Sequence, residues 1–132
     1  MTNPHTKREA QIGQIARVHA DARRTVDELN LAHGAHVVQY CVTDASTPLG
    51  CDFHKMRDET FVIVIGSGSV VLQHVDDGSQ PIDDRVVYDI TQGSVVYIPR
   101  YCAHRFDLAV GTQMIGFATR AFDETDVHPF EM

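Results

Sequence analysis

The chain has 132 residues, of which 43% are hydrophobic and 22% charged, and its formal net charge is −7. These values are typical of a single folded domain that buries roughly two thirds of its surface. The acidic excess argues against nucleic acid or an anionic membrane as a partner, because both select basic surfaces. No apolar run approaches the roughly 20 residues of a membrane span, and the polar start lacks the apolar core of a signal peptide. The sequence therefore predicts a cytoplasmic protein, and its three cysteines argue against a disulfide framework.

The first 11 residues are polar and are expected to be frayed. The segment 12–31 admits two interpretations. It fits a helix with Ile15, Val18 and Ala22 on one face, or two short strands around a turn at 21–24. We favour the strands, which would cover Gln14–His19 and Thr25–Leu29.

The rest of the chain has the pattern of a β protein. Short runs rich in β-branched and aromatic residues alternate with turns that contain glycine. The predicted strands are His36–Thr43, Cys51–Met56, Thr60–Ile65, Ser69–Val75, Arg85–Ile90, Ser94–Ile98, His104–Ala109 and Gln113–Thr119. Strands spaced in this way indicate a β-sandwich or barrel. One domain over residues 1–132 is expected, ending in an acidic tail that is mostly loop.

Two segments concentrate residues that can carry chemistry. The first runs from Gly50 to Gly66 and contains Asp52, His54 and Glu59. Because side chains alternate along a strand, Asp52 and His54 share one face, and a bend can bring Glu59 beside His54. In the second segment, a strand that follows Gly93 ends at Pro99, and the next strand begins at His104.

These two segments resemble the paired motifs of the cupin superfamily. The first motif is matched at Gly50, His54, Glu59 and Gly66, and the second at Gly93, Pro99 and His104. The sequence departs from the family pattern at three positions, where Asp52 replaces a histidine, Tyr101 a glycine and Leu108 an asparagine. The resemblance implies an all-β double-stranded β-helix, the cupin jelly-roll barrel, with its site in the barrel mouth.

The same resemblance implies a metal site. Carried over by position, the ligands are Asp52, His54, Glu59 and His104, which suit a divalent transition metal such as Zn, Fe, Mn or Ni. Asp52 is either a fourth ligand or a partner that orients His54. The superfamily also has metal-free members, in which Glu59 would be a solvated carboxylate and His104 a core histidine.

A narrower resemblance connects the run from His54 to Gly66 with cupins that act on sugars, including nucleotide-sugar epimerases and 3,4-ketoisomerases. In the ketoisomerases, which work without metal, a Gly-His-x-His-Lys segment supplies histidine bases. His54 would be the remaining base here, with Asp52 at the other position. Tyr97 alternates with Val95 and Pro99 and is predicted to face the barrel interior, where it could return or relay a proton.

Three further residues are candidates for binding substrate. Gln73 could face the pocket from its strand or point to solvent. Arg100 and Tyr101 follow the proline of the second motif and could hold a carboxylate or phosphate at the mouth. The alternative for Arg100 is a solvated side chain or a contact in a dimer.

Three functions remain open at this point. The first is a metal-binding cupin enzyme that isomerises, epimerises or oxidises a small polar molecule. The second is a metal-free nucleotide-sugar epimerase or 3,4-ketoisomerase that uses His54 as its base. The third is a ligand-binding module without catalysis, because a fold alone cannot decide among them. A homodimer that pairs its N-terminal strands is also expected, as is common among cupins.

Overall fold

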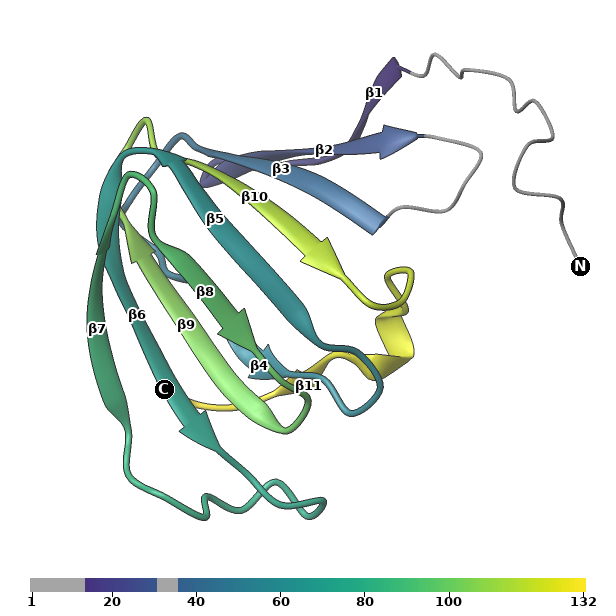
Figure 1. Cartoon of the computed structure of the whole chain (residues 1–132), viewed down its shortest axis with the longest axis vertical. Helices are drawn as coiled ribbons and strands as arrows, with labels where there is room; N and C mark the ends of the chain where they lie inside the picture. The colour runs from purple at the N-terminus through teal and green to yellow at the C-terminus, as the bar shows by residue number, and fades with distance from the viewer. Residues whose placement is uncertain (1–13, 31–35) are drawn as a thin grey trace, which may run out of the picture.

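The computed structural model describes residues 14–30 and 36–132, and the predicted frayed segment 1–11 lies outside them. Two antiparallel sheets face each other (Figure 1). The six-stranded sheet has the order β1-β2-β3-β10-β5-β8 and the five-stranded sheet the order β11-β4-β9-β6-β7. The strands are β1 (Gln14–Ala20), β2 (Arg24–Asn30), β3 (His36–Val42), β4 (Leu49–Phe53), β5 (Glu59–Ile65), β6 (Ser67–His74), β7 (Val86–Thr91), β8 (Val95–Ile98), β9 (Cys102–Leu108), β10 (Gln113–Ala118) and β11 (His128–Pro129).

The N-terminal segment forms two strands, which confirms the strand interpretation over the helix. β1 and β2 pair in antiparallel fashion and meet at a tight turn. The side chain of Asp21 holds that turn, because its Oδ1 accepts hydrogen bonds from the backbone N–H groups of Arg23 and Arg24 at 2.8 and 3.1 Å. An aspartate that binds the backbone just ahead of it favours a turn over a continuing helix.

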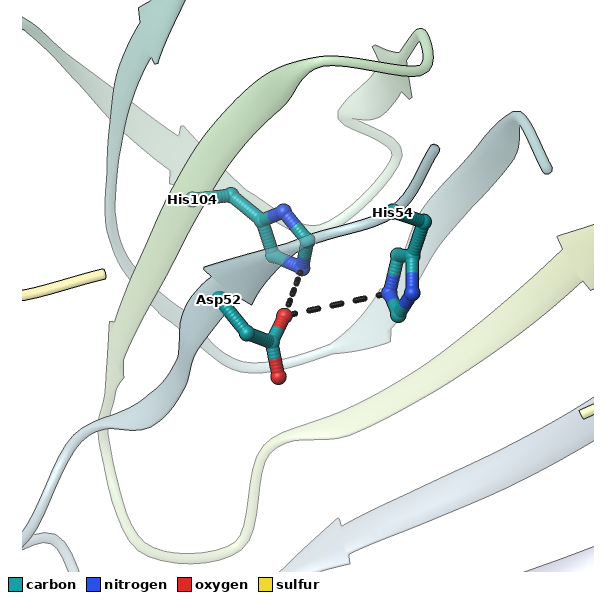
Figure 2. Close-up of side chains that lie close together, drawn as sticks. All are labelled: Asp52, His54 and His104. Atoms are coloured by element: carbon teal, nitrogen blue, oxygen red, sulfur yellow. Dashed lines mark ion pairs between the residues drawn. The ribbon is translucent and has the colours of Figure 1, made fainter. Parts of the chain in front are cut away.

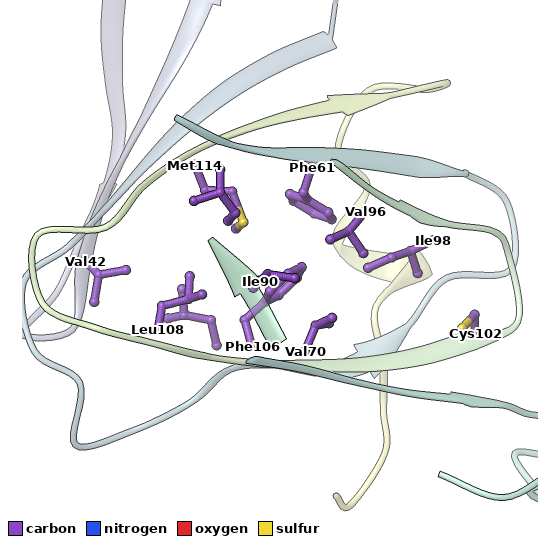
Figure 3. Packing of buried hydrophobic residues seen from close by; sticks show 12 residues of the cluster. Val42, Phe61, Val70, Ile90, Val96, Ile98, Cys102, Phe106, Leu108 and Met114 are labelled. Carbon is purple, nitrogen blue, oxygen red and sulfur yellow. The ribbon is translucent and has the colours of Figure 1, made fainter. Parts of the chain in front are cut away.

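The core lies between the two sheets, as Figure 3 shows. Inward-facing residues alternate with outward-facing ones along each strand, so that Phe61 and Ile63 of β5 meet Phe106 and Leu108 of β9. The buried members are Val42, Leu49, Phe61, Ile63, Val70, Ile90, Val96, Ile98, Cys102, Phe106, Leu108 and Met114. Two sheets wound around one such core form a cupin-type jelly roll, which confirms the predicted fold class.

The C-terminal tail is more ordered than a loop. A 3-10 turn spans Glu124–Asp126, and β11 then pairs with β4. The ring of Phe130 packs against Phe53 on the outer side of the five-stranded sheet. β4 itself ends at Phe53, three residues before the predicted end. No helix in the described part of the chain is long and apolar enough to cross a membrane.

Candidate functional site

Four polar side chains meet between the two sheets, at the end where β4 finishes and β5 begins. Asp52 lies in β4 opposite His104 of β9, His54 follows β4, and Glu59 opens β5. The His104 Nε2 atom lies 3.3 Å from Asp52 Oδ1 and 3.7 Å from Glu59 Oε1. The His54 Nε2 atom lies 3.1 Å from Glu59 Oε1 and 3.8 Å from Asp52 Oδ1. We call these four residues the polar cluster, and Figure 2 shows three of them.

A β-bulge turns Asp52 toward the interior. The pairing of β4 with β9 shifts between Gly50 and Asp52, and Cys51 between them has a positive φ of 61°. Gly50 also has a positive φ of 90°, and a Cβ there would lie only 2.8 Å from the carbonyl oxygen of His104. Glycine therefore allows β9 to approach closely enough for His104 to face Asp52.

Backbone carbonyls fix the tautomers of both histidines. His54 Nδ1 lies 2.7 Å from the carbonyl oxygen of Asp126, and His104 Nδ1 lies 3.2 Å from that of Cys102. A carbonyl oxygen can only accept, so each ring donates its Nδ1–H. In the neutral rings, both Nε2 lone pairs then point at carboxylate oxygens. Such an arrangement is repulsive unless a proton or a metal cation lies between the atoms.

The surroundings of the Glu59 carboxylate favour such a cation most clearly. Its Oε2 accepts a hydrogen bond from Arg57 at 2.9 Å, but its Oε1 is buried without a hydrogen-bond partner among the described residues. A buried, unsatisfied carboxylate oxygen costs free energy and calls for an explanation. One oxygen or nitrogen atom from each of Asp52, His54 and His104 lies within 4.8 Å of the others, as a shared metal requires. These donors fit a divalent transition metal.

Without a metal, the same atoms share protons. Burial lowers the pKa of His54, but close contact with the negative charge of Glu59 outweighs it and leaves that pKa above its ordinary value. Burial raises the pKa of Glu59, but close contact with His54 and the charges of His104 and His54 leave it below its ordinary value. The arrangement can therefore hold a cation or take part in acid–base chemistry.

A cavity of about 250 Å³ opens onto the polar cluster, and a second of about 330 Å³ continues it over the inner face of β1, β2 and β3. Both cavities are lined by Arg24, Tyr40, Arg57, Glu59 and Phe61. A ligand at the cluster can therefore extend along the six-stranded sheet.

The sequence analysis did not identify Arg24, Tyr40 or Arg57. Burial, followed by the charge of Glu59, raises the pKa of Tyr40 to about 12. Arg24 lies over the Tyr40 ring at 5.7 Å, and the Nε atoms of Arg24 and Arg57 are buried without hydrogen-bond partners in the described part of the chain. Alternation through Val38, Tyr40 and Val42 was a usable signal for Tyr40, since it places these residues on one face.

The interior position predicted for Tyr97 is wrong. The side chains of Val96 and Ile98 enter the core from β8, so Tyr97 points outward and is 59% exposed. The two alternating sets on this strand are both apolar, and the sequence therefore did not show which set faces inward.

The three predicted substrate-binding residues lie elsewhere. Gln73 is buried and bonded to the carbonyl oxygen of Asp83 and to Arg85. Arg100 is paired with Asp58 at the surface. The Tyr101 ring packs against Phe53, and its hydroxyl donates to Asp77. The described lining of the two cavities includes none of the three.

The two sheets and their order define a cupin-type jelly-roll fold. No protein-family model matches the sequence, and no curated protein matches it either. Solved structures do match. The capsular polysaccharide assembling protein CapF from Staphylococcus aureus is 20% identical with a TM-score of 0.73, over 93% of this chain and 33% of that one.

Two smaller proteins are also similar. QdtA, a sugar 3,4-ketoisomerase from Thermoanaerobacterium thermosaccharolyticum solved with TDP, is 22% identical with a TM-score of 0.59, over 70% of this chain and 64% of that one. Streptomyces PAC13, solved as a single-residue variant with uridine, is 17% identical with a TM-score of 0.62. The match covers 96% of this chain and 94% of PAC13. This chain spans about a third of the CapF chains that it matches. At these identities, the likeness shows a shared fold.

Proposed function

We propose that this chain is a metal-dependent cupin enzyme that isomerises or epimerises a small anionic carbonyl compound, with keto-sugars as the first class to test. The observation that carries the proposal is the convergence of two histidine Nε2 atoms on the carboxylates of Asp52 and Glu59. Two of the structural neighbours support the choice of substrate class, since QdtA is a sugar 3,4-ketoisomerase and PAC13 was solved with uridine.

The residues of the polar cluster would have different roles in the reaction. A divalent metal held by Asp52, His54, Glu59 and His104 would polarise the substrate carbonyl and acidify the C–H bond beside it. The Asp52 side chain is 22% exposed, compared with 5–7% for the other three. Its carboxylate is therefore the one best placed to reach a substrate C–H and act as the base. Arg57 holds Glu59 in place through the 2.9 Å hydrogen bond.

Tyr40 would act as a donor. With a pKa of about 12, its hydroxyl remains protonated at neutral pH. It lines both cavities beside Glu59, where it can donate a hydrogen bond or a proton to a substrate oxygen. In this scheme, Tyr40 takes the role that the sequence analysis gave to Tyr97.

Arg24 and Arg57 would bind the anionic group of the substrate. Each has a buried Nε atom without a hydrogen-bond partner among the described residues, although the protein as a whole is acidic. A guanidinium group matches the geometry of a phosphate or carboxylate. Both arginines line the cavity at the polar cluster and its continuation, so an anionic group bound there would lie next to the reacting carbonyl.

A metal-free mechanism is the second candidate, and the contact between His54 Nε2 and Glu59 Oε1 at 3.1 Å favours it. In this case, the hydrogen bond from Nδ1–H to the Asp126 carbonyl would orient His54, its Nε2 would be the base that removes the proton beside the carbonyl, and Glu59 would stabilise the imidazolium that forms. The resemblance to the 3,4-ketoisomerases and the structural likeness to QdtA are consistent with this alternative.

Exchange of substrate hydrogen with solvent tests both mechanisms. Protein loaded in turn with Zn, Mn, Fe or Ni is incubated in D₂O with free and nucleotide-linked keto-sugars, and deuterium incorporation is followed by ¹H NMR. Incorporation that needs metal and disappears in Asp52→Asn supports the proposal. Incorporation that continues in excess chelator supports the metal-free mechanism. Tight binding with no exchange, under all these conditions, would favour a ligand-binding module and overturn both.

We also propose a homodimer. The surface that supports it is the outer face of the six-stranded sheet and not the pairing of N-terminal strands expected from the sequence. Tyr97, Thr60 and Phe117 lie in one row across the outer face of the six-stranded sheet. Tyr97 and Phe117 are 59% and 45% exposed, and Val95 in the next row is 65% exposed. Apolar side chains gathered on one sheet face are typical of an interface. Light scattering on a size-exclusion column should give twice the mass of one chain for the wild type. The Phe117→Lys variant should give the mass of a single chain.

A further inference from the structure

Asp126 is a buried acidic residue that the proposed mechanism does not use. It ends the 3-10 turn of the C-terminal tail and is 5% exposed. We propose that Asp126 is a positioning residue that holds His54 in the tautomer and orientation that the polar cluster needs. This inference rests on the proposed function, because it assigns the tail a part in building the same site.

Residue 126 contacts the chain around His54 from two directions. Its carbonyl oxygen accepts the Nδ1–H of His54 at 2.7 Å. Its carboxylate accepts the backbone N–H groups of the next two residues, Lys55 at 2.8 Å and Met56 at 3.1 Å. Both oxygens of the Asp126 carboxylate are therefore bound to the turn that carries His54. These bonds fix the distance between the Asp126 carbonyl oxygen and the His54 ring.

The tail is anchored on both sides of Asp126. Before it, the carboxylate of Asp123 caps the 3-10 turn by accepting from Thr125 N at 2.9 Å. After it, His128 pairs with Phe53 in β4, and the Phe130 N–H donates to the carbonyl oxygen of Cys51 at 3.0 Å. The Nε2 atom of His128 also lies 3.4 Å from the Oδ1 atom of Asp126. These contacts leave residue 126 little freedom to move away from His54.

The two histidines of the polar cluster are thus oriented by different means. His104 donates to the carbonyl of Cys102, two residues away on its own strand, so its tautomer depends on local geometry. His54 donates to a carbonyl 72 residues away in the chain. If the tail shifts, His54 can rotate or move its proton to Nε2, which removes the lone pair from the cluster.

Histidine tautomers can be read directly, without metal or substrate, by long-range ¹H–¹⁵N NMR over a range of alkaline pH values. The wild type should show His54 as the Nδ1–H tautomer, and Asp126→Ala should convert it to a mixture. His104 serves as the internal reference and should stay unchanged. Asp126→Asn, which keeps one acceptor oxygen, should show a smaller change and guards against loss of folding in the alanine variant.

Phe130→Ala is the matched control, because it removes a tail side chain that packs against Phe53 and leaves the Asp126 contacts with the chain around His54 in place. Zn²⁺ affinity should fall about 10–100-fold in Asp126→Ala, as for other residues that orient a metal-bound histidine, and remain near wild type in Phe130→Ala. An unchanged His54 tautomer in Asp126→Ala would overturn the inference, and so would an equal change in Phe130→Ala. A wild type that takes up no metal would count against the proposed function, whereas the tautomer measurement would still decide the role of Asp126.

Discussion

The interior of this jelly roll has an apolar region and a polar one, built by the same strands. β5 places Glu59, Phe61 and Ile63 on its inner face in succession, and β9 does the same with His104, Phe106 and Leu108. Along both strands, the inward row therefore changes from polar to apolar. The rings of Phe61 and Phe106 lie 5.1 Å apart at the border.

The two regions differ in how completely their groups are satisfied. The apolar core residues are buried and packed against one another, and burial of apolar surface is the main source of stability. In the polar cluster, buried Glu59 Oε1 lacks a hydrogen-bond partner among the described residues, and two histidine nitrogens face carboxylates. The stability of this fold therefore comes mainly from the core, and the unsatisfied groups of the cluster are consistent with the metal site that we propose.

Removing volume from the apolar core should have the largest effect on stability and leave metal binding intact. Ile63 is 0% exposed, and Ile63→Ala should lower the free energy of unfolding by about 2–5 kcal/mol through lost burial and a cavity. The neighbouring Val64 is 39% exposed, so Val64→Ala should stay within about 0.5 kcal/mol. Urea unfolding with metal titration of both variants measures this. A large loss of metal affinity in folded Ile63→Ala would break the separation of the two regions.

Removing one charge from the polar cluster should weaken metal binding without unfolding the protein. Glu59→Gln keeps the shape but loses the carboxylate, and metal affinity should fall at least about 100-fold, since even outer partners of metal ligands cost about 10–100-fold. Asp58→Asn is the control, because that carboxylate binds Arg100 at the surface. Competition with a chromophoric chelator reports the affinity. Equal affinities in the wild type and Glu59→Gln would remove Glu59 from the ligand set.

Substrate binding should respond more modestly to changes in the arginines. Arg24→Gln should raise the KM of an anionic substrate about 10–100-fold, because a hydrogen bond to a charged group contributes about 1.5–3 kcal/mol. The rate constant kcat should change little. Arg17→Gln, in the same hairpin but paired with Asp27 at an exposed position, should leave both constants near wild type. A fall in kcat at constant KM would instead connect Arg24 with the chemical step.

The spacing of strands and turns predicted a β-sandwich or barrel, and the resemblance to the cupin motifs supplied the jelly roll and the inclusion of His104 in the polar cluster. Alternation along β4 placed Asp52 and His54 on one face, and the turns at glycine and proline separated the strands correctly. The cluster could be predicted because its residues lie at or beside strand ends in two short motifs. The structure then brought all four together from both sheets.

Contacts from distant parts of the chain could not be predicted. Nothing in the sequence around His54 indicates that the carbonyl oxygen of residue 126 accepts its hydrogen bond, because this contact depends on where the tail pairs with β4. The same applies to Arg24 and Tyr40, which reach the cavity only because β2 and β3 extend the six-stranded sheet. The prediction that Tyr97 faces the interior was wrong for a simpler reason, since both faces of β8 are apolar in sequence.

The metal content of the purified protein decides whether the polar cluster is a metal site. Untagged protein prepared without chelator is compared with a double variant, His54→Ala and His104→Ala, by elemental analysis. The proposed metal site requires about one divalent transition metal per wild-type chain and none in the variant. A wild type that holds no metal, even after reloading with Zn, Fe, Mn and Ni in turn, would contradict it and leave His54 to act as a base without metal.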